Sequence, residues 1–157
     1  MKPFWQDSFS RMTYGIYVLT TRHETVINGM IASWVSQVSH DPPLIMVAVH
    51  PSRFSHELME KSGCFALHVI SRSQKDLLNR FKGPEPLKKF TGIAWQAGKT
   101  GCPVLNDCLA WFECAIRERY QPGNHSLFVG EVFRAGFAGE AVPLCTLDYE
   151  GVYTGRW

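Results

Sequence analysis

Residues 28–56 read NGMIASWVSQVSHDPPLIMVAVHPSRFSH, and this stretch decides the fold. Its first part has the apolar and β-branched residues of a strand, but a serine stands at every third position, at Ser33, Ser36 and Ser39. Neighbours on one face of a regular strand are two residues apart, so these serines cannot share a face. The spacing indicates either a bulge or a main chain that meets something other than a strand. The alternative is a half-exposed edge strand whose serines face water.

Of residues 1–157, 45% are hydrophobic and 19% are charged. This length and composition are typical of one ordinary globular domain. The 16 basic and 14 acidic residues nearly cancel and form no run, so neither nucleic acid nor anionic lipid is expected as a partner. The N-terminus lacks the pattern of a secretory leader, and no run approaches the roughly 20 apolar residues of a membrane span. We therefore expect a cytoplasmic domain that acts on small molecules.

The five cysteines form no C-x-x-C pair and are odd in number, which favours reduced thiols over a zinc site or a disulfide framework. The six histidines are equally dispersed. No metal site is expected.

Six runs rich in β-branched and aromatic residues, each bounded by turn-forming residues, predict strands at 14–21, 30–39, 44–50, 65–70, 109–120 and 126–137. The cluster QPGNH at 121–125 predicts an antiparallel hairpin between the last two. One face of the first hairpin strand is expected to join the core, namely Ala110, Phe112, Cys114, Ile116 and Glu118.

Two short helices are expected between these strands. Ser55 is expected to cap a helix that stops at Gly63, and Ser73 with Asp76 to form a capping box before a helix that stops near Gly83. Residues 82–103 are irregular around one possible strand at 91–96, which suggests a functional or partner-facing segment. Many short strands and few helices predict a mainly β, antiparallel, closed or partly closed barrel.

The turn PSRFSH at 51–56 supplies two hydroxyls, a guanidinium and an imidazole where a helix is expected to begin. Unpaired N–H groups and the positive end of the helix dipole attract anions, so the turn predicts a phosphate site. Alternatively, Ser55 only caps the helix while Arg53 and His56 face water. Neither G-x-G-x-x-G nor a P-loop is present. A polar strand followed by an anion site suits a ligand with a flat ring and a phosphate tail, a shape that FMN has.

The sequence resembles the flavin reductase-like proteins with the FMN-binding split barrel, a Greek-key-type fold. The matching segments run in the family's order along nearly the whole chain: 28–39, 41–44, 52–56, 63–66, 74–81, 89–90 and 124–132. Trp34 and Gln37 look more like flavoredoxins, and like reductase modules fused to rubredoxin or flavodiiron proteins, than like the reductases of two-component monooxygenases.

The resemblance implies where the flavin would bind. Backbone groups and hydroxyls near the serines would line the isoalloxazine, and the turn after the next strand would hold the ribityl chain and phosphate. The implied cofactor-binding residues are Asn28, Ala32, Ser33, Trp34, Val35, Ser36, Val49, His50, Ser52, Arg53, Phe54, Ser55, His56 and Lys89.

The resemblance also implies that His125 lies beside the flavin where a nicotinamide stacks, and that the protein is a homodimer with the flavin near its interface. The family usually has Asp before this histidine, whereas this chain has Asn124, which removes a carboxylate that would raise the pKa of His125. By position alone, His125 would be an ordinary turn residue, Lys89 a solvated lysine, and Trp34 a residue of the barrel wall.

Two functions follow from the resemblance. The first is an NAD(P)H-dependent flavin reductase in which hydride passes from NADH or NADPH to flavin N5 and electrons pass on to an acceptor. The second is a flavoredoxin-like electron carrier, reduced by a redox protein such as rubredoxin or a flavodiiron protein, without a nicotinamide site. A third reading keeps the barrel with another ligand, such as haem or a deazaflavin.

Overall fold

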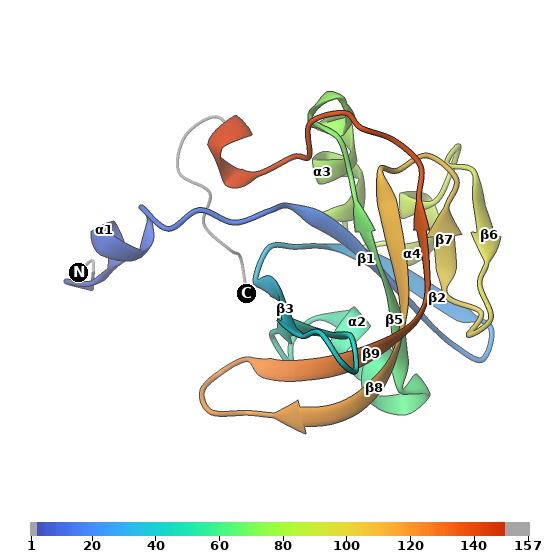
Figure 1. Cartoon of the computed structure of the whole chain (residues 1–157), viewed down its shortest axis with the longest axis horizontal. Coiled ribbons are helices and arrows are strands. Elements are labelled where there is room, and N and C mark those ends of the chain that lie inside the picture. The colour runs from blue at the N-terminus through green and yellow to red at the C-terminus, as the bar shows by residue number, and fades with distance from the viewer. Residues whose placement is uncertain (1–2, 150–157) are drawn as a thin grey trace.

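A computed structural model describes residues 3–149, and its main element is a seven-stranded antiparallel sheet in the order β2-β1-β5-β8-β9-β4-β3 (Figure 1). The strands are β1 (Tyr17–His23), β2 (Val26–Ala32), β3 (Val35–Ser39), β4 (Leu44–Val49), β5 (Cys64–Val69), β8 (Ala110–Tyr120) and β9 (Ser126–Phe137). The mainly β, antiparallel fold expected from the strand pattern is confirmed.

The first and last strands in this order, β2 and β3, are consecutive in the chain. Only Ser33 and Trp34 separate them. So short a connection spans at most roughly 11 Å, so the two edges of the sheet must lie side by side at this point. We call these two residues the seam. The Trp34 carbonyl accepts a hydrogen bond from Ala48 N–H at 3.0 Å, which ties the seam to β4. No ladder joins β2 to β3, so the sheet forms a split barrel.

The seam also explains the serine spacing. The single strand expected at 30–39 is wrong, because the chain breaks at the seam into two strands that lie at opposite edges of the sheet. Ser33 lies in the seam and Ser36 within β3, while Ser39 follows a register shift that begins at Gln37. The bulge that the spacing indicated is therefore present, and the main-chain contact with something other than a strand stays a prediction.

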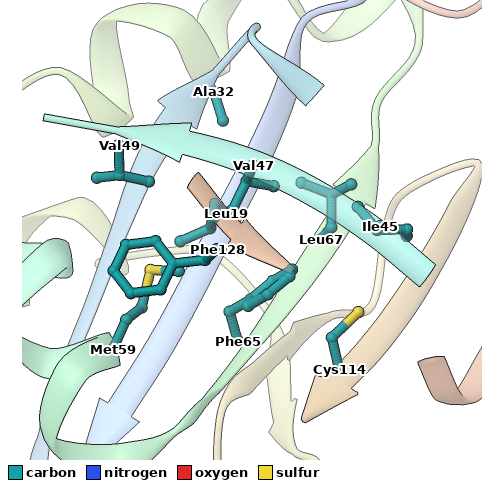
Figure 2. Packing of buried hydrophobic residues seen from close by; sticks show 10 residues of the cluster. All are labelled: Leu19, Ala32, Ile45, Val47, Val49, Met59, Phe65, Leu67, Cys114 and Phe128. Carbon is teal, nitrogen blue, oxygen red and sulfur yellow. The ribbon is translucent and has the colours of Figure 1, made fainter. Parts of the chain in front are cut away.

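Two apolar cores lie on the two faces of the sheet. The barrel interior holds buried side chains from several strands and from helix α2, as Figure 2 shows: Leu19, Ala32, Ile45, Val47, Val49, Met59, Phe65, Leu67, Cys114 and Phe128. A second cluster packs helices α3 and α4 on the outer face: Ile16, Val18, Ile70, Leu77, Leu78, Phe81, Phe90, Leu105 and Leu144. Because β1 and β5 lie between these cores, nearly all of β5 and the middle of β1, residues 18–21, are buried.

The helices are short, and their ends differ from expectation. They are α1 (Gln6–Phe9), α2 (Phe54–Ser62), α3 (Asp76–Phe81) and α4 (Pro86–Lys89), with 3-10 turns η1 (Arg72–Gln74) and η2 (Thr146–Asp148). Helix α2 ends at Gly63 as expected, but its N-cap is Arg53, so the cap assigned to Ser55 is wrong. The capping box is formed by Ser71 and Gln74 around η1, two residues before the expected position.

The segment between residues 82 and 103 contains more structure than expected. Helix α4 was not predicted, and β6 (Trp95–Ala97) pairs with β7 (Pro103–Leu105) in a small second sheet. In β8, Cys114 is buried as expected, but Glu118 is exposed, because β8 is exposed on both faces from Arg117 to Tyr120. Glu113, on the face expected to be outside, is fully buried and pairs with Arg134.

The five cysteines are free thiols. No helix among residues 3–149 is long and apolar enough to cross a membrane. The cytoplasmic location stays a prediction.

The assignment of the core predicts that alanine substitution of two phenylalanines changes the free energy of unfolding by very different amounts. Phe65→Ala removes a ring that is 0% exposed in the barrel interior, and we expect a loss of about 3–5 kcal/mol in the free energy of unfolding. Phe137→Ala removes a ring that is 77% exposed at the end of β9, and we expect a change within about 0.5 kcal/mol. Urea unfolding followed by circular dichroism measures both; equal losses would contradict this assignment of the core.

Candidate functional site

A buried lysine forms the centre of the predicted anion site. Lys89, at the end of α4, is 7% exposed. Its Nζ donates to Asn28 Oδ1 at 3.0 Å and to the Gly29 carbonyl at 2.8 Å, both on β2. Asn28 Nδ2 in turn donates to Ser55 Oγ at 2.9 Å on α2. Three elements that are distant in sequence are thus joined by one chain of hydrogen bonds, which we call the cradle (Asn28, Ser55 and Lys89).

The cradle carries positive charge without a compensating carboxylate. Burial, and to a smaller extent the nearby Arg53 guanidinium, lower the pKa of Lys89 to about 8. Within residues 3–149, the ion pairs of the structure include neither of these cations. A buried ammonium whose partners are neutral oxygens is unfavourable unless an anion joins it. The donor set therefore fits a phosphate group.

Gly29 explains why Lys89 can reach β2. A Cβ atom on Gly29 would lie 2.6 Å from the Phe81 ring and 3.2 Å from the Phe90 ring. The missing side chain therefore lets these two rings, which meet edge to face, pack directly on the strand. Phe90 follows Lys89 in the chain, so this packing brings the lysine over Asn28.

The turn between β4 and α2 lies beside the cradle. Ser52 N–H donates to His50 Nδ1 at 3.1 Å, and Ser52 Oγ lies 2.8 Å from the same nitrogen. Arg53 N–H donates to the His50 carbonyl at 3.0 Å, so the turn is tightly closed. Phe54, the first residue of α2, is 41% exposed. Helix α2 begins at this turn, and the positive end of its dipole adds to the cations of the site.

Three rings form a second part of the site, which we call the ring cluster (Trp34, His50 and His125). The centroids of Trp34 and His125 are 4.7 Å apart, and those of His50 and His125 are 5.2 Å apart in an edge-to-face arrangement. These residues come from the seam, from the end of β4 and from the start of β9. Their apolar and polar edges suit a flat heteroaromatic ligand.

His125 is poised to be uncharged at neutral pH. Its Nδ1 lies 2.8 Å from Asn124 Oδ1, which only accepts, so Nδ1 carries the hydrogen. Its pKa is lowered by burial and then by His50 and Arg53. The absence of a carboxylate at position 124 is consistent with this lowered pKa.

The predicted site residues lie in different places. Asn28, Ser55 and Lys89 form the cradle, with Arg53 near Lys89. Trp34, His50 and His125 form the ring cluster, and Ser52 is bonded to His50. The side chains of Ala32 and Val49 point into the barrel core, so only their backbone could meet a ligand. Ser33 lies in the seam, while Val35 and Ser36 border an apolar pocket of about 420 Å³ together with β4, β5, β8 and β9 residues.

His56 has partners other than the cradle. The ring is 3% exposed; Nε2 lies 2.7 Å from Ser126 Oγ, and Nδ1 lies 2.9 Å from Glu60 Oε1. Both nitrogens are therefore engaged within the chain, and the expected phosphate contact stays a prediction.

Sequence reasoning missed Glu60, Arg119 and Ser126, which surround His56. The i,i+4 spacing of His56 and Glu60 on a helix was a usable signal. Arg119 and Ser126 meet only through the register of the β8–β9 hairpin, which no local pattern encodes. Among residues 3–149, no group of three or more His, Cys, Asp or Glu side chains could hold a metal ion.

Comparison with known proteins agrees with this geometry. The model of the flavin reductase like domain matches residues 9–155. A probable flavin reductase from Rhizobium meliloti is 34% identical over 128 residues, 81% of this chain and 41% of the relative. The high molecular weight rubredoxin of Moorella thermoacetica is 30% identical over 92% of this chain and 65% of its own length. The chain thus spans less than two thirds of either relative.

Among solved structures, an NADH:FAD oxidoreductase from Streptomyces globisporus in complex with NAD and FAD fragments superposes with a TM-score of 0.82. It is 26% identical, and the match covers 89% of this chain and 84% of that one. The fold is therefore shared with a protein whose structure holds NAD and FAD fragments.

Lys89 predicts a pH dependence of stability in the ligand-free chain. Its folded pKa of about 8 is below the ordinary 10.5, so between these values the unfolded chain binds more protons and stability rises with pH. Below about pH 8 the lysine is charged in both states, and the slope from this group disappears. Urea unfolding between pH 7 and 10.5 should show the rise in wild type and its loss in Lys89→Met. The exposed neighbour gives the control, since Lys88→Met should keep the rise; a rise that survives Lys89→Met would contradict the assignment.

Proposed function

We propose that this chain, which belongs to the flavin reductase-like family, binds FMN and catalyses its reduction by NADH or NADPH. One observation carries the proposal: the Arg53 guanidinium lies near a buried lysine that has no carboxylate partner and also near His125 of the ring cluster at the barrel seam. The proposal treats residues 1–157 as one flavin-binding domain, to which strands from residue 17 to residue 137 contribute.

The charge of the cradle supports FMN over other flavins. A terminal phosphate monoester carries close to two negative charges at neutral pH, and Lys89 with Arg53 supplies two positive ones. The inner phosphate of FAD carries one charge and must continue outward to a second phosphate. Riboflavin has no phosphate for the cradle. The cradle would hold the FMN phosphate, and bound phosphate would favour the charged form of Lys89.

The ring cluster lies at the other end of the site. When bound, the flavin supplies the hydride chemistry, accepting hydride at N5 from a nicotinamide. The task of the protein is alignment. Trp34 and His125 would border the isoalloxazine and exclude water, while the seam's backbone groups would offer hydrogen bonds to its polar edge. His125, neutral and held by Asn124, would orient the nicotinamide without placing a positive charge beside it.

The acceptor and the assembly belong to the same proposal. A relative that is named for rubredoxin favours a redox protein as one class of electron acceptor. We also propose a homodimer, because the pocket of about 420 Å³ near β3 is lined mainly by apolar side chains that a second copy could cover. The carrier function without a nicotinamide site remains the second candidate, favoured by the same rubredoxin relative.

The phosphate end is tested by comparing FMN, FAD and riboflavin. We expect Arg53→Ala to weaken FMN binding about 10- to 100-fold, because one charge-assisted contact is lost. Riboflavin binding should be the same in wild type and Arg53→Ala, and FAD should bind wild type more weakly than FMN. Quenching of flavin fluorescence measures all the dissociation constants. An equal loss for riboflavin would show that Arg53 does not act on phosphate.

The ring end is tested by His125→Gln. We expect the rate constant of flavin reduction, followed by anaerobic stopped-flow absorbance, to fall roughly 10-fold or more because the nicotinamide is misaligned. The dissociation constant for FMN should stay close to wild type. As a matched control in the same protein, His23→Gln at the end of β1, where the ring lies 3.9 Å from the Glu24 carboxylate, should leave both quantities unchanged. Full activity in His125→Gln would remove this residue from the mechanism.

A further inference from the structure

Four side chains form a closed hydrogen-bonded ring next to the site, which we call the His56 network (His56, Glu60, Arg119 and Ser126). His56 Nε2 lies 2.7 Å from Ser126 Oγ, and Nδ1 lies 2.9 Å from Glu60 Oε1. Arg119 closes the ring, with NH2 at 3.1 Å from Glu60 Oε1 and 3.3 Å from Ser126 Oγ. The members come from α2, β8 and β9.

The order serine, histidine, carboxylate is that of a hydrolase triad, but the environment excludes this chemistry. Ser126 is 0% exposed and His56 is 3% exposed, so no substrate can reach the hydroxyl. The Arg119 guanidinium also donates to that hydroxyl oxygen. An activated serine nucleophile needs an open face toward its substrate. The network therefore holds structure in place and performs no acyl transfer.

The two ends of the network adjoin the two ends of the site. His56 follows Ser55, which belongs to the cradle, and Ser126 follows His125, which belongs to the ring cluster. The hydrogen bond between His56 and Ser126 is thus a direct link from the start of α2 to the start of β9. Phe128 of β9 packs against the His56 ring edge to face at 5.1 Å and supports the same link.

We propose that the His56 network is a positioning device that holds His125 at a fixed place relative to the cradle, and that protonation of His56 weakens it. The inference rests on the proposed function, since the spacing matters because one flavin would span both ends. His56, Glu60, Arg119 and Ser126 are positioning residues in this scheme.

The donors and acceptors balance only while His56 is neutral. Nδ1–H then donates to Glu60, and Nε2 accepts from the Ser126 hydroxyl, whose oxygen accepts from Arg119. If Nε2 gains a proton it must donate to Ser126, and the serine hydrogen then lacks this acceptor in a fully buried place. The Ser126 oxygen then accepts from both His56 and Arg119, while its own hydrogen has lost its acceptor. The link therefore reverses its direction and becomes weaker, and the position of the neighbouring His125 changes with it.

The charged groups around His56 predict that its pKa shifts in opposite directions when Glu60 and when Arg119 is replaced. Burial lowers its pKa first; Glu60 on α2 raises it, and Arg119 on β8 and His50 after β4 lower it. Removing the carboxylate should therefore lower the pKa further, while removing the guanidinium should raise it. The pKa of His125 is set by burial, His50 and Arg53, so neither change acts on it directly.

The test is an NMR titration of the imidazole groups in the flavin-free full chain. In Glu60→Gln we expect the His56 pKa to fall by roughly 0.5 unit, and in Arg119→Gln to rise by a similar amount. The chemical shift of the His125 ring, plotted against pH, should show an inflection at the pKa of His56 in wild type and in both variants. Ser126→Ala, which keeps His56 but cuts the link, should lose that inflection.

Two results would overturn the proposal: shifts in the same direction for both variants, or a His125 inflection that survives in Ser126→Ala. Glu60 and Arg119 are each 40% exposed, so Glu60→Gln and Arg119→Gln should fold even if Ser126→Ala does not. In that case the opposite shifts of the His56 pKa in these two variants test the proposal. In the reductase assay, the acid limb of the flavin reduction rate should track the His56 pKa across the variants. If NADH and NADPH reduce no flavin, the proposed function fails while the titration still tests the network.

Discussion

The two residues between β2 and β3 are the constraint on which the rest of the structure depends. They join the two outermost strands of a seven-stranded sheet, so the sheet must curl until its edges meet. Closure encloses the barrel core, and it brings Trp34 close to the ends of β4 and β9, where His50 and His125 stand. The same curl places Asn28 of β2 beside the start of α2. A regular strand through residues 30–39 would have separated these groups.

Much of this arrangement could be predicted from local pattern. Alternation and turn residues located most strands, and serines spaced by three indicated an irregular chain. The pattern could not show that the irregularity is a change of strand, because that depends on which neighbours β2 and β3 find. The role of Lys89 is similar: in sequence it is one of two adjacent lysines, and only packing of Phe90 on Gly29 distinguishes it from exposed Lys88. The His56 network depends on hairpin register and was invisible.

Charge and burial make the two ends of the site chemically different. At one end, cations are held without carboxylates, which favours an anion; at the other, two histidines with a tryptophan form an environment in which His125 is uncharged at neutral pH. A ligand that spans both ends must be elongated, with a phosphate tail and a flat head. The hydrogen bonds from Ser55 to Asn28 and from His56 to Ser126 connect these ends through the protein itself. The site is therefore built as one unit from five separate segments of the chain.

The measurement that decides most is the anaerobic visible spectrum of the purified protein with FMN, recorded before and after adding NADH and then NADPH. We expect a bound flavin spectrum that one nucleotide bleaches quickly without any protein partner. A flavin that stays oxidised with both nucleotides but is bleached by dithionite would contradict the reductase and favour the electron carrier. A protein that takes up no FMN would contradict the flavin site itself.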